Sequence, residues 1–159
     1  IDYYNNTGGI STTSTDYTVR KKVDLGNNEG PPDAYWVPDS GGVVIASPQL
    51  VANFDFNRAF LKSKFHEAAD RYVKYLKENP GHKILIHGHT DLVGDSAYCR
   101  KLSLRRAQTV AGYIKGQGVS AQRITTKGWG KLHPKWTVEE NDWQAAENRR
   151  IEVVLYEDK

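Results

Sequence analysis

A short run in the middle of the chain, His87-Gly88-His89-Thr90-Asp91, contains side chains suited to chemistry. Its imidazoles are two residues apart, so on a β-strand they lie on one face and could bind zinc together with Asp91. A metallohydrolase would need another ligand, and the remaining histidines have no motif spacing to this run. We therefore expect no metal and no cofactor. A strand end at which Asp91 organises the turn is the favoured interpretation, and a metal-dependent hydrolase is the minor alternative.

A second candidate is the pair Asp91 and Arg106, fifteen residues apart. We expect Asp91 at a strand end and Arg106 in the first turn of the next helix, an arrangement that could direct both toward one site. Arginine binds a carboxylate through two parallel hydrogen bonds, and aspartate binds an ammonium group. Held apart, the pair would suit a zwitterion. From spacing alone, an exposed helix arginine and a turn aspartate are the more ordinary interpretation.

Three other features are weaker. Cys99 is the only cysteine, and no signature pairs it with a base, so we expect a buried or incidental thiol and no enzyme. The basic cluster Arg100, Lys101, Arg105 and Arg106 is interrupted by apolar residues and is typical of a solvated helix face. Asn148-Arg149-Arg150 is either a pair of surface arginines or a second carboxylate clamp.

The composition limits the class of protein. A chain of 159 residues, 38% hydrophobic and 26% charged, fits one compact soluble domain plus some unstructured length. A net charge of +3 is too mild to indicate a nucleic-acid partner. No apolar run is long enough to span a membrane, and the single cysteine excludes an internal disulfide. The chain starts at Ile1 without any methionine, so we expect a processed or trimmed piece that would lack any targeting or lipid-anchoring segment.

Two parts are expected. Residues 1–42 are rich in Asn, Gly, Ser, Thr and Pro and predict an extended N-terminal arm or linker. Its aromatic residues suggest that parts of it pack on the domain; these are Tyr3, Tyr4, Tyr17, Tyr35 and Trp36. Residues 43–159 predict the folded domain.

Within that domain, alternation and helical spacing predict the elements in order. Strands are expected at 43–46 and 50–56, separated by Pro48, then at 83–89, 123–127 and 151–156. Helices are expected from about Asn57 to Lys77, from Ser103 as N-cap to about Ile114, and at 141–147 after a loop at 131–140. The order β-α-β-α-β-(α)-β predicts an α+β two-layer sandwich, with helices on one face of a mixed sheet.

With these elements in place, an ordered set of residues resembles the OmpA-like C-terminal domain. This is the peptidoglycan-binding module of outer-membrane proteins, peptidoglycan-associated lipoproteins and flagellar stators. The resemblance covers about residues 50–156. The matching residues are Phe54-Asp55-Phe56-Asn57, His89-Thr90-Asp91, Gly94, Tyr98, Leu102-Ser103, Arg106-Ala107, Gly118-Val119, Arg123-Ile124, Gly128, Gly130, Pro134 and 148–152.

The resemblance implies roles for individual residues. Asp91 would bind the ammonium group and Arg106 the carboxylate of diaminopimelate in the peptidoglycan stem peptide. Asn57 matches a pocket residue, Leu102 the pocket wall, and Arg149 a further carboxylate contact. The family usually has Asn in place of Cys99, where it contacts the ligand, and a thiol is a poorer hydrogen-bonding group.

The implied function is non-catalytic anchoring of an outer-membrane protein, lipoprotein or envelope complex to the cell wall. The implied place is the periplasm of a Gram-negative bacterium, with the membrane reached only through a missing anchor. The alternative is a structural subunit of a secretion or motility complex, with other envelope proteins as partners and weak or lost wall binding. Cys99 and the unusual arm motivate that alternative.

Overall fold

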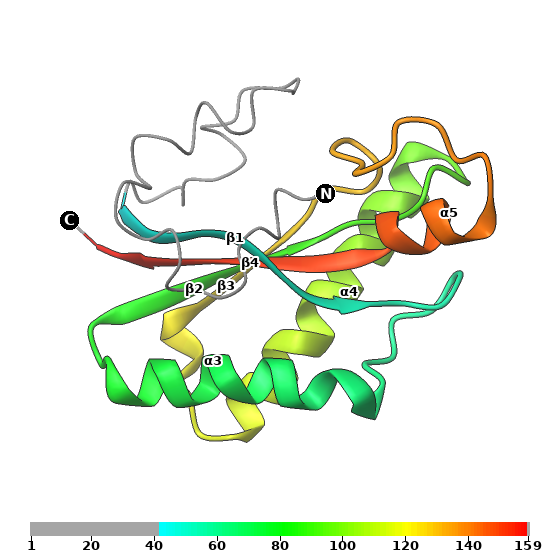
Figure 1. The fold of residues 1–159 in the computed structure, drawn as a ribbon. Helices are drawn as coiled ribbons and strands as arrows, with labels where there is room; N and C mark the ends of the chain where they lie inside the picture. The colour runs from blue at the N-terminus through cyan, green and yellow to red at the C-terminus, as the bar shows by residue number, and fades with distance from the viewer. Residues whose placement is uncertain (1–41, 159) are drawn as a thin grey trace.

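The computed structural model describes residues 42–158, which form a four-stranded mixed sheet with helices packed against it (Figure 1). The strands are β1 (Val43–Asn53), β2 (His82–Gly88), β3 (Ile124–Gly128) and β4 (Arg150–Glu157), in the spatial order β1-β4-β2-β3. β4 runs antiparallel to both β1 and β2, whereas β2 and β3 are parallel. The predicted α+β class and the mixed sheet are confirmed. The expected arm lies outside the described residues, apart from Gly42.

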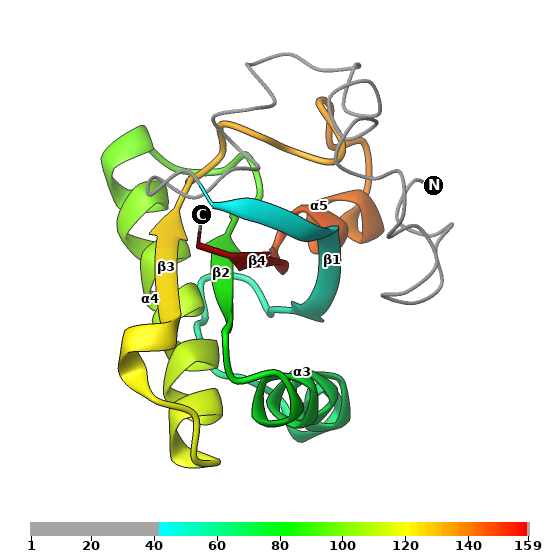
Figure 2. The same ribbon diagram turned by 90° about the vertical axis from the view of Figure 1, so that its left-hand side faces the viewer.

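The two long helices, α3 (His66–Glu78) and α4 (Ser96–Gly116), lie on the same face of the sheet (Figures 1 and 2). A short helix, α5 (Asp142–Asn148), precedes β4, and single 3-10 turns, η4 (Ser63–Phe65) and η5 (Ala121–Arg123), precede α3 and β3. Within residues 42–158, no helix has the length and apolar content that crossing a membrane requires. Because both long helices lie on one face of the sheet, the predicted two-layer arrangement is confirmed.

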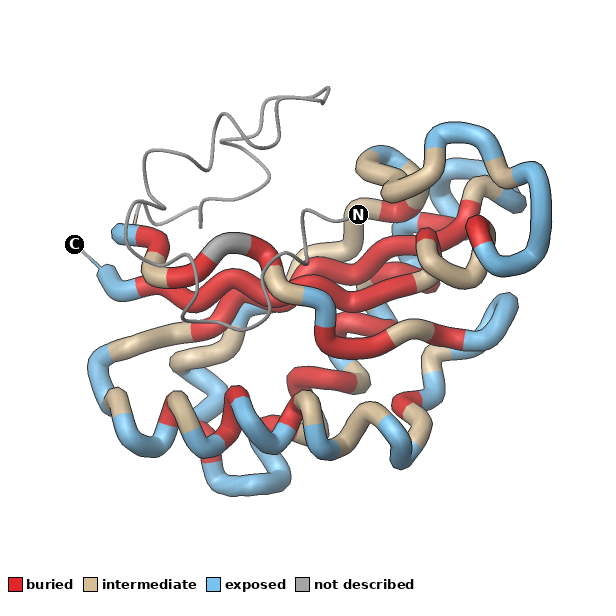
Figure 3. Tube along the Cα trace, viewed as in Figure 1, coloured by how far each residue is buried: buried red, intermediate tan, exposed pale blue. Residues whose placement is uncertain are grey.

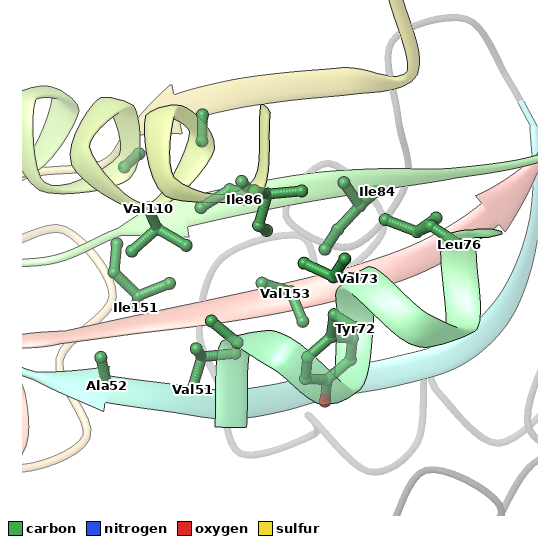
Figure 4. Packing of buried hydrophobic residues seen from close by; sticks show 14 of the residues in the cluster. Val51, Ala52, Tyr72, Val73, Leu76, Ile84, Ile86, Val110, Ile151 and Val153 are labelled. Carbon is green, nitrogen blue, oxygen red and sulfur yellow. The ribbon is translucent and has the colours of Figure 1, made fainter. Parts of the chain in front are cut away.

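The core lies between the sheet and the two long helices. Ile84 and Ile86 of β2 and Val153 of β4 meet Val73 of α3 and Val110 of α4, as Figure 4 shows. Because side chains alternate along β2, Leu85 and His87 lie on the other face. β4 is buried on both faces from Arg150 to Tyr156 (Figure 3), which its alternating sequence did not predict.

The strand predictions are close, with one correction. β1 is one continuous strand from Val43 to Asn53, where two strands separated by Pro48 were expected. The register against β4 shifts between Ala46 and Gln49. A proline that cannot donate a ladder hydrogen bond is tolerated at such a bulge on an edge strand. The predicted ends of β2 and β3 differ from the observed ones by one residue.

Both long helices start elsewhere than predicted. α3 begins at His66, not near Asn57, because Asn57 has a positive φ of 61° and the chain around it forms a loop. α4 begins at Ser96, with Asp95 as its N-cap accepting a hydrogen bond from the backbone N–H of Tyr98. Ser103 is therefore not a cap but a buried residue inside the helix.

Candidate functional site

The residues of interest gather where β2 ends and β4 begins. These two strands are paired up to Gly88 and Ile151, and the N–H of His89 still donates to the carbonyl of Arg150 at 3.0 Å. The antiparallel register therefore brings the residue just before β4, Arg149, close to the turn that follows β2. The N–H of Thr90 donates to the carbonyl of Gly130, which fixes that turn from the β3 side.

Asp91 and Arg149 form an ion pair at this place. Nη1 of Arg149 lies 3.0 Å from Oδ2 of Asp91, and their side chains are only 14% and 6% exposed. The other carboxylate oxygen of Asp91 accepts a hydrogen bond from the N–H of Val93, which closes the turn. Arg149 also donates from Nε to the carbonyl of Phe54 at 2.7 Å. One guanidinium thus joins the end of β1 to the turn after β2.

Arg106 projects from the middle of α4 and is completely buried. It donates three hydrogen bonds to backbone carbonyl oxygens, at 2.7 Å to Arg58, 2.9 Å to His89 and 3.1 Å to Asp55. Its guanidinium also lies over the ring of Phe54. Burial lowers the pKa of Arg106 to about 10, whereas the nearby charge of Asp91 acts in the opposite direction.

The position of Arg106 corrects one prediction. Arg106 was expected in the first turn of the helix, but α4 starts at Ser96, ten residues before Arg106. The charge of Asp91 raises the pKa of Arg106 against the larger effect of burial, whereas the ion-pair partner of Asp91 is Arg149. Arg106 is directed to the β1–α3 loop and the strand end, so it organises the backbone around Asp91.

Glycines allow α4 to pack directly on the strands. A Cβ at Gly88 would lie 2.0 Å from the carbonyl oxygen of Ser103, and one at Gly128 would lie 2.6 Å from the N–H nitrogen of Leu104. Only a residue without a side chain permits this approach. The hydroxyl of Ser103 additionally accepts a hydrogen bond from the N–H of Gly130. These contacts fix the position of α4 beside the end of β2.

The other predicted residues surround this centre. Asn57, in the β1–α3 loop, accepts a hydrogen bond from the hydroxyl of Tyr98. Its positive φ suits asparagine, which tolerates the left-handed region better than most residues. Cys99 and Leu102 are buried on the same face of α4 as Arg106. The thiol of Cys99 lies 3.2 Å from the carbonyl of Val93, so it supports the turn that contains Asp91.

Sequence reasoning missed three contributors. Tyr98 was quoted in the family pattern without a role, yet it holds Asn57. Lys131 donates from Nζ to the carbonyl of Gly94 at 2.5 Å, and Glu139 accepts the N–H of Leu92 at 2.9 Å. Lys131 and Glu139 come from the loop after β3, about forty residues further along the chain, and no local spacing predicts their contact with this turn.

The histidines of the opening motif point to separate partners. His87 shares a 2.6 Å hydrogen bond with the indole N–H of Trp129, and Nε2 of His89 lies 3.9 Å from a carboxylate oxygen of Glu152. Burial lowers the pKa of His87 to about 3 and that of His89 well below its usual value. Within residues 42–158 no group of three or more His, Cys, Asp or Glu side chains could hold a metal ion.

The basic residues divide between surface and interior. Arg100, Lys101 and Arg105 are exposed on α4, whereas Arg106 is buried. The interpretation of Asn148-Arg149-Arg150 as surface arginines is wrong. Arg150 is 3% exposed and donates from Nε to Glu152 at 2.8 Å, on a strand that has neighbours on both sides.

Comparison with known proteins identifies the family. Residues 53–150 match the model described as OmpA family. The chain is 32% identical over 142 residues to outer membrane protein A of Bordetella avium, covering 77% of this chain and 73% of that protein. It is 36% identical over 101 residues to the peptidoglycan-associated lipoprotein of Legionella pneumophila, covering 64% and 57%. For another curated relative, which is a much longer protein, the match covers 14% of the length of that relative.

The fold agrees with the sequence match. The crystal structure of the peptidoglycan-associated lipoprotein from Burkholderia pseudomallei superposes with a TM-score of 0.64 at 28% identity, covering 67% of this chain and 90% of that one. The matched region contains Asn57, Asp91, Cys99, Leu102, Arg106 and Arg149. A family model that covers more than half of the sequence, together with this similarity of fold, shows that the chain belongs to the OmpA family.

Proposed function

We propose that this domain binds peptidoglycan without catalysis and anchors an envelope component to the cell wall. The observation that supports this best is the nearly buried pair of Asp91 and Arg149, at 3.0 Å, beside the buried cation of Arg106. A carboxylate and a guanidinium at one strand end offer both charges that a zwitterion needs. The names of relatives such as the peptidoglycan-associated lipoproteins support the same assignment.

The ligand that we propose is the free end of diaminopimelate in the stem peptide, which has an ammonium group and a carboxylate on one carbon. Its ammonium would bind Asp91, and its carboxylate would bind Arg149, so that one internal ion pair is exchanged for two external ones. Each buried charge would then still face an opposite charge. A buried charge without such compensation would cost several kcal/mol. The hydrogen bond from Arg149 to the carbonyl of Phe54 would keep the guanidinium oriented during the exchange.

Arg106 has a different part in this proposal. A guanidinium has five N–H donors. Three of these N–H groups in Arg106 donate hydrogen bonds to backbone carbonyl oxygens. Arg106 is completely buried, so its remaining donors can take a carboxylate only if the residues around it move. Without such movement, Arg106 contributes its positive charge and holds the loop that presents Asn57. Leu102 and Cys99 form the wall of the site on α4.

The setting that follows is the periplasm of a Gram-negative bacterium, with a tether to the outer membrane. A single site of modest affinity is sufficient there, because many copies engage one polymer and the effective concentration is high. The names of relatives as outer membrane proteins and lipoproteins support this location.

Co-sedimentation with purified sacculi tests the proposal. Wild type and Asp91→Asn are compared, with Asp95→Asn as a matched control, since Asp95 is an exposed carboxylate at the N-cap of α4 and asparagine caps helices equally well. We expect wild type and Asp95→Asn to pellet with sacculi and Asp91→Asn to remain largely in solution. Equal pelleting of all three proteins would contradict the assignment of Asp91.

A second candidate function is a structural subunit of a secretion or motility complex with weak wall binding. The presence of Cys99 where the family resemblance implies asparagine favours it. The same assay separates the two candidates. Folded wild-type protein that fails to pellet with sacculi would favour the structural subunit.

A further inference from the structure

A second apolar cluster lies on the face of the sheet opposite α3 and α4. It consists of Val44, Leu85, Val154 and Tyr156, from three neighbouring strands. Leu85 lies between Ile84 and Ile86, which face the helices, so alternation directs Leu85 to the opposite side. The same holds for Val154, between Val153 and Leu155. Leu85 and Val154 are nevertheless 0% exposed.

The described helices do not account for this burial. α3 and α4 lie on the other face, and α5 lies at the opposite end of β1, where Asn53 donates to the carbonyl of Ala146 (Figures 1 and 2). Val44, by contrast, is at the beginning of β1 and pairs with Tyr156 near the end of β4. These four apolar side chains from three strands therefore form a contiguous buried patch that neither α3, α4 nor α5 covers.

The chain enters the described domain beside this cluster. A Cβ placed on Gly42 would lie 2.8 Å from the ring of Tyr156 and 2.6 Å from the carbonyl oxygen of Glu157. Gly42 therefore lies at the edge of the cluster itself. A short apolar run, Tyr35-Trp36-Val37, lies within seven residues of Gly42.

From these observations we infer that Tyr35, Trp36 and Val37 dock on the cluster of Val44, Leu85, Val154 and Tyr156. The distance is suitable, since six residues of extended chain span at most about 20 Å, and three paired strands are roughly 10 Å across. A segment of the same chain also has an advantage over a second copy or a partner, because its attachment at Gly42 gives it a high effective concentration.

Docking would change what the N-terminal segment does. A docked segment fixes the point from which any preceding chain leaves the domain, and so shortens the reach between the domain and whatever the segment is attached to. This inference does not depend on the proposed function, because it concerns the face of the sheet away from Asp91 and Arg149.

The test uses the full chain, with Trp36→Ala compared against Trp143→Ala, since Trp143 is 54% exposed on α5. We expect Trp36→Ala to lower the Tm by roughly 5–10 °C, as loss of a buried tryptophan does in a protein of this size. We expect a smaller decrease for Trp143→Ala. A decrease for Trp36→Ala no larger than that for Trp143→Ala would overturn the inference.

Fluorescence gives a second readout that does not need the alanine variant to fold. The emission of Trp36 is obtained by subtracting the spectrum of Trp36→Phe from that of wild type. Docking predicts that acrylamide quenches this emission much less in the native protein than in urea. Equal quenching in both states would overturn the inference. An exposed Trp36 in a protein that dimerises with concentration would assign the cluster to a second copy instead.

Discussion

Nη1 of Arg149 lies 3.0 Å from Oδ2 of Asp91, although the two residues are 58 positions apart in the chain. The pairing of β2 with β4 creates this contact, because one residue follows the first strand and the other precedes the second. The ion pair neutralises both charges in the absence of a ligand. In the proposed function, a ligand ammonium group takes the place of Arg149 on Asp91, and the guanidinium of Arg149 then binds the carboxylate of the same ligand.

Arg106 is predicted to contribute strongly to stability. The Arg106→Ala variant loses the buried guanidinium and its three hydrogen bonds. The carbonyl oxygens of Asp55, Arg58 and His89 then lose these donors. We expect the free energy of unfolding to fall by at least about 3 kcal/mol in urea denaturation. The control is Arg105→Ala on the exposed side of α4, expected within about 0.5 kcal/mol of wild type. Similar losses in both variants would show that Arg106 does not hold the loop.

Cys99→Asn is predicted to strengthen binding. The family resemblance implies asparagine at this position, and an amide offers both donors and an acceptor where the thiol is a weak donor. One added hydrogen bond of about 1 kcal/mol corresponds to roughly fivefold tighter binding. Isothermal titration with a muropeptide measures it, and Cys99→Ala, which loses the thiol contact with Val93, is the control. An asparagine variant that keeps its Tm and binds no tighter would contradict the role given to this position.

Three buried groups, His87, His89 and Glu152, predict that the folded protein is most stable near pH 6.5. Burial lowers the pKa of His87 to about 3 and lowers that of His89, so below pH 6.5 the unfolded chain binds protons that the folded one does not. Burial raises the pKa of Glu152 to about 8, although Nε of Arg150 lies 2.8 Å from its carboxylate. Between pH 4.5 and 8, the folded chain therefore retains a proton that the unfolded chain releases. Stability therefore falls on both sides of this pH.

Urea denaturation at pH 5, 6.5 and 8 measures this profile. The variant Glu152→Gln cannot ionise at this position, and we expect it to lose the decline between pH 6.5 and 8 while it keeps the decline toward pH 5. If wild type and Glu152→Gln have the same profile above pH 6.5, the carboxyl group is not the cause.

The order of elements could be predicted from the sequence because each element has a clear period. Ile84 and Ile86 alternate with Leu85 and His87, and the apolar residues of α3 recur at helical spacing. The start of α4 was missed because its first turn is exposed and lacks an apolar stripe. A cap such as Asp95 is then a weaker signal than Ser103, which precedes an apolar helix face.

Candidate site residues could be named from the sequence, but the contacts that they make could not. Asp91 and Arg106 were expected to face one ligand, yet Arg106 binds carbonyl oxygens, which leave no trace in the identity of the residues that provide them. The partner of Asp91 is Arg149, and this depends on the register of β4. The arginine and the aspartate of a tertiary ion pair have no fixed spacing, so only the family pattern indicated that both belong to the site.

In the proposed function, Asp91 and Arg149 exchange their internal ion pair for a zwitterion of the stem peptide. Isothermal titration of a diaminopimelate-containing muropeptide into wild type, Asp91→Asn and Asp95→Asn measures it most directly. We predict that Asp91→Asn binds roughly tenfold or more weakly than wild type, whereas Asp95→Asn binds as wild type does. Equal affinity of wild type and a folded Asp91→Asn would contradict the claim.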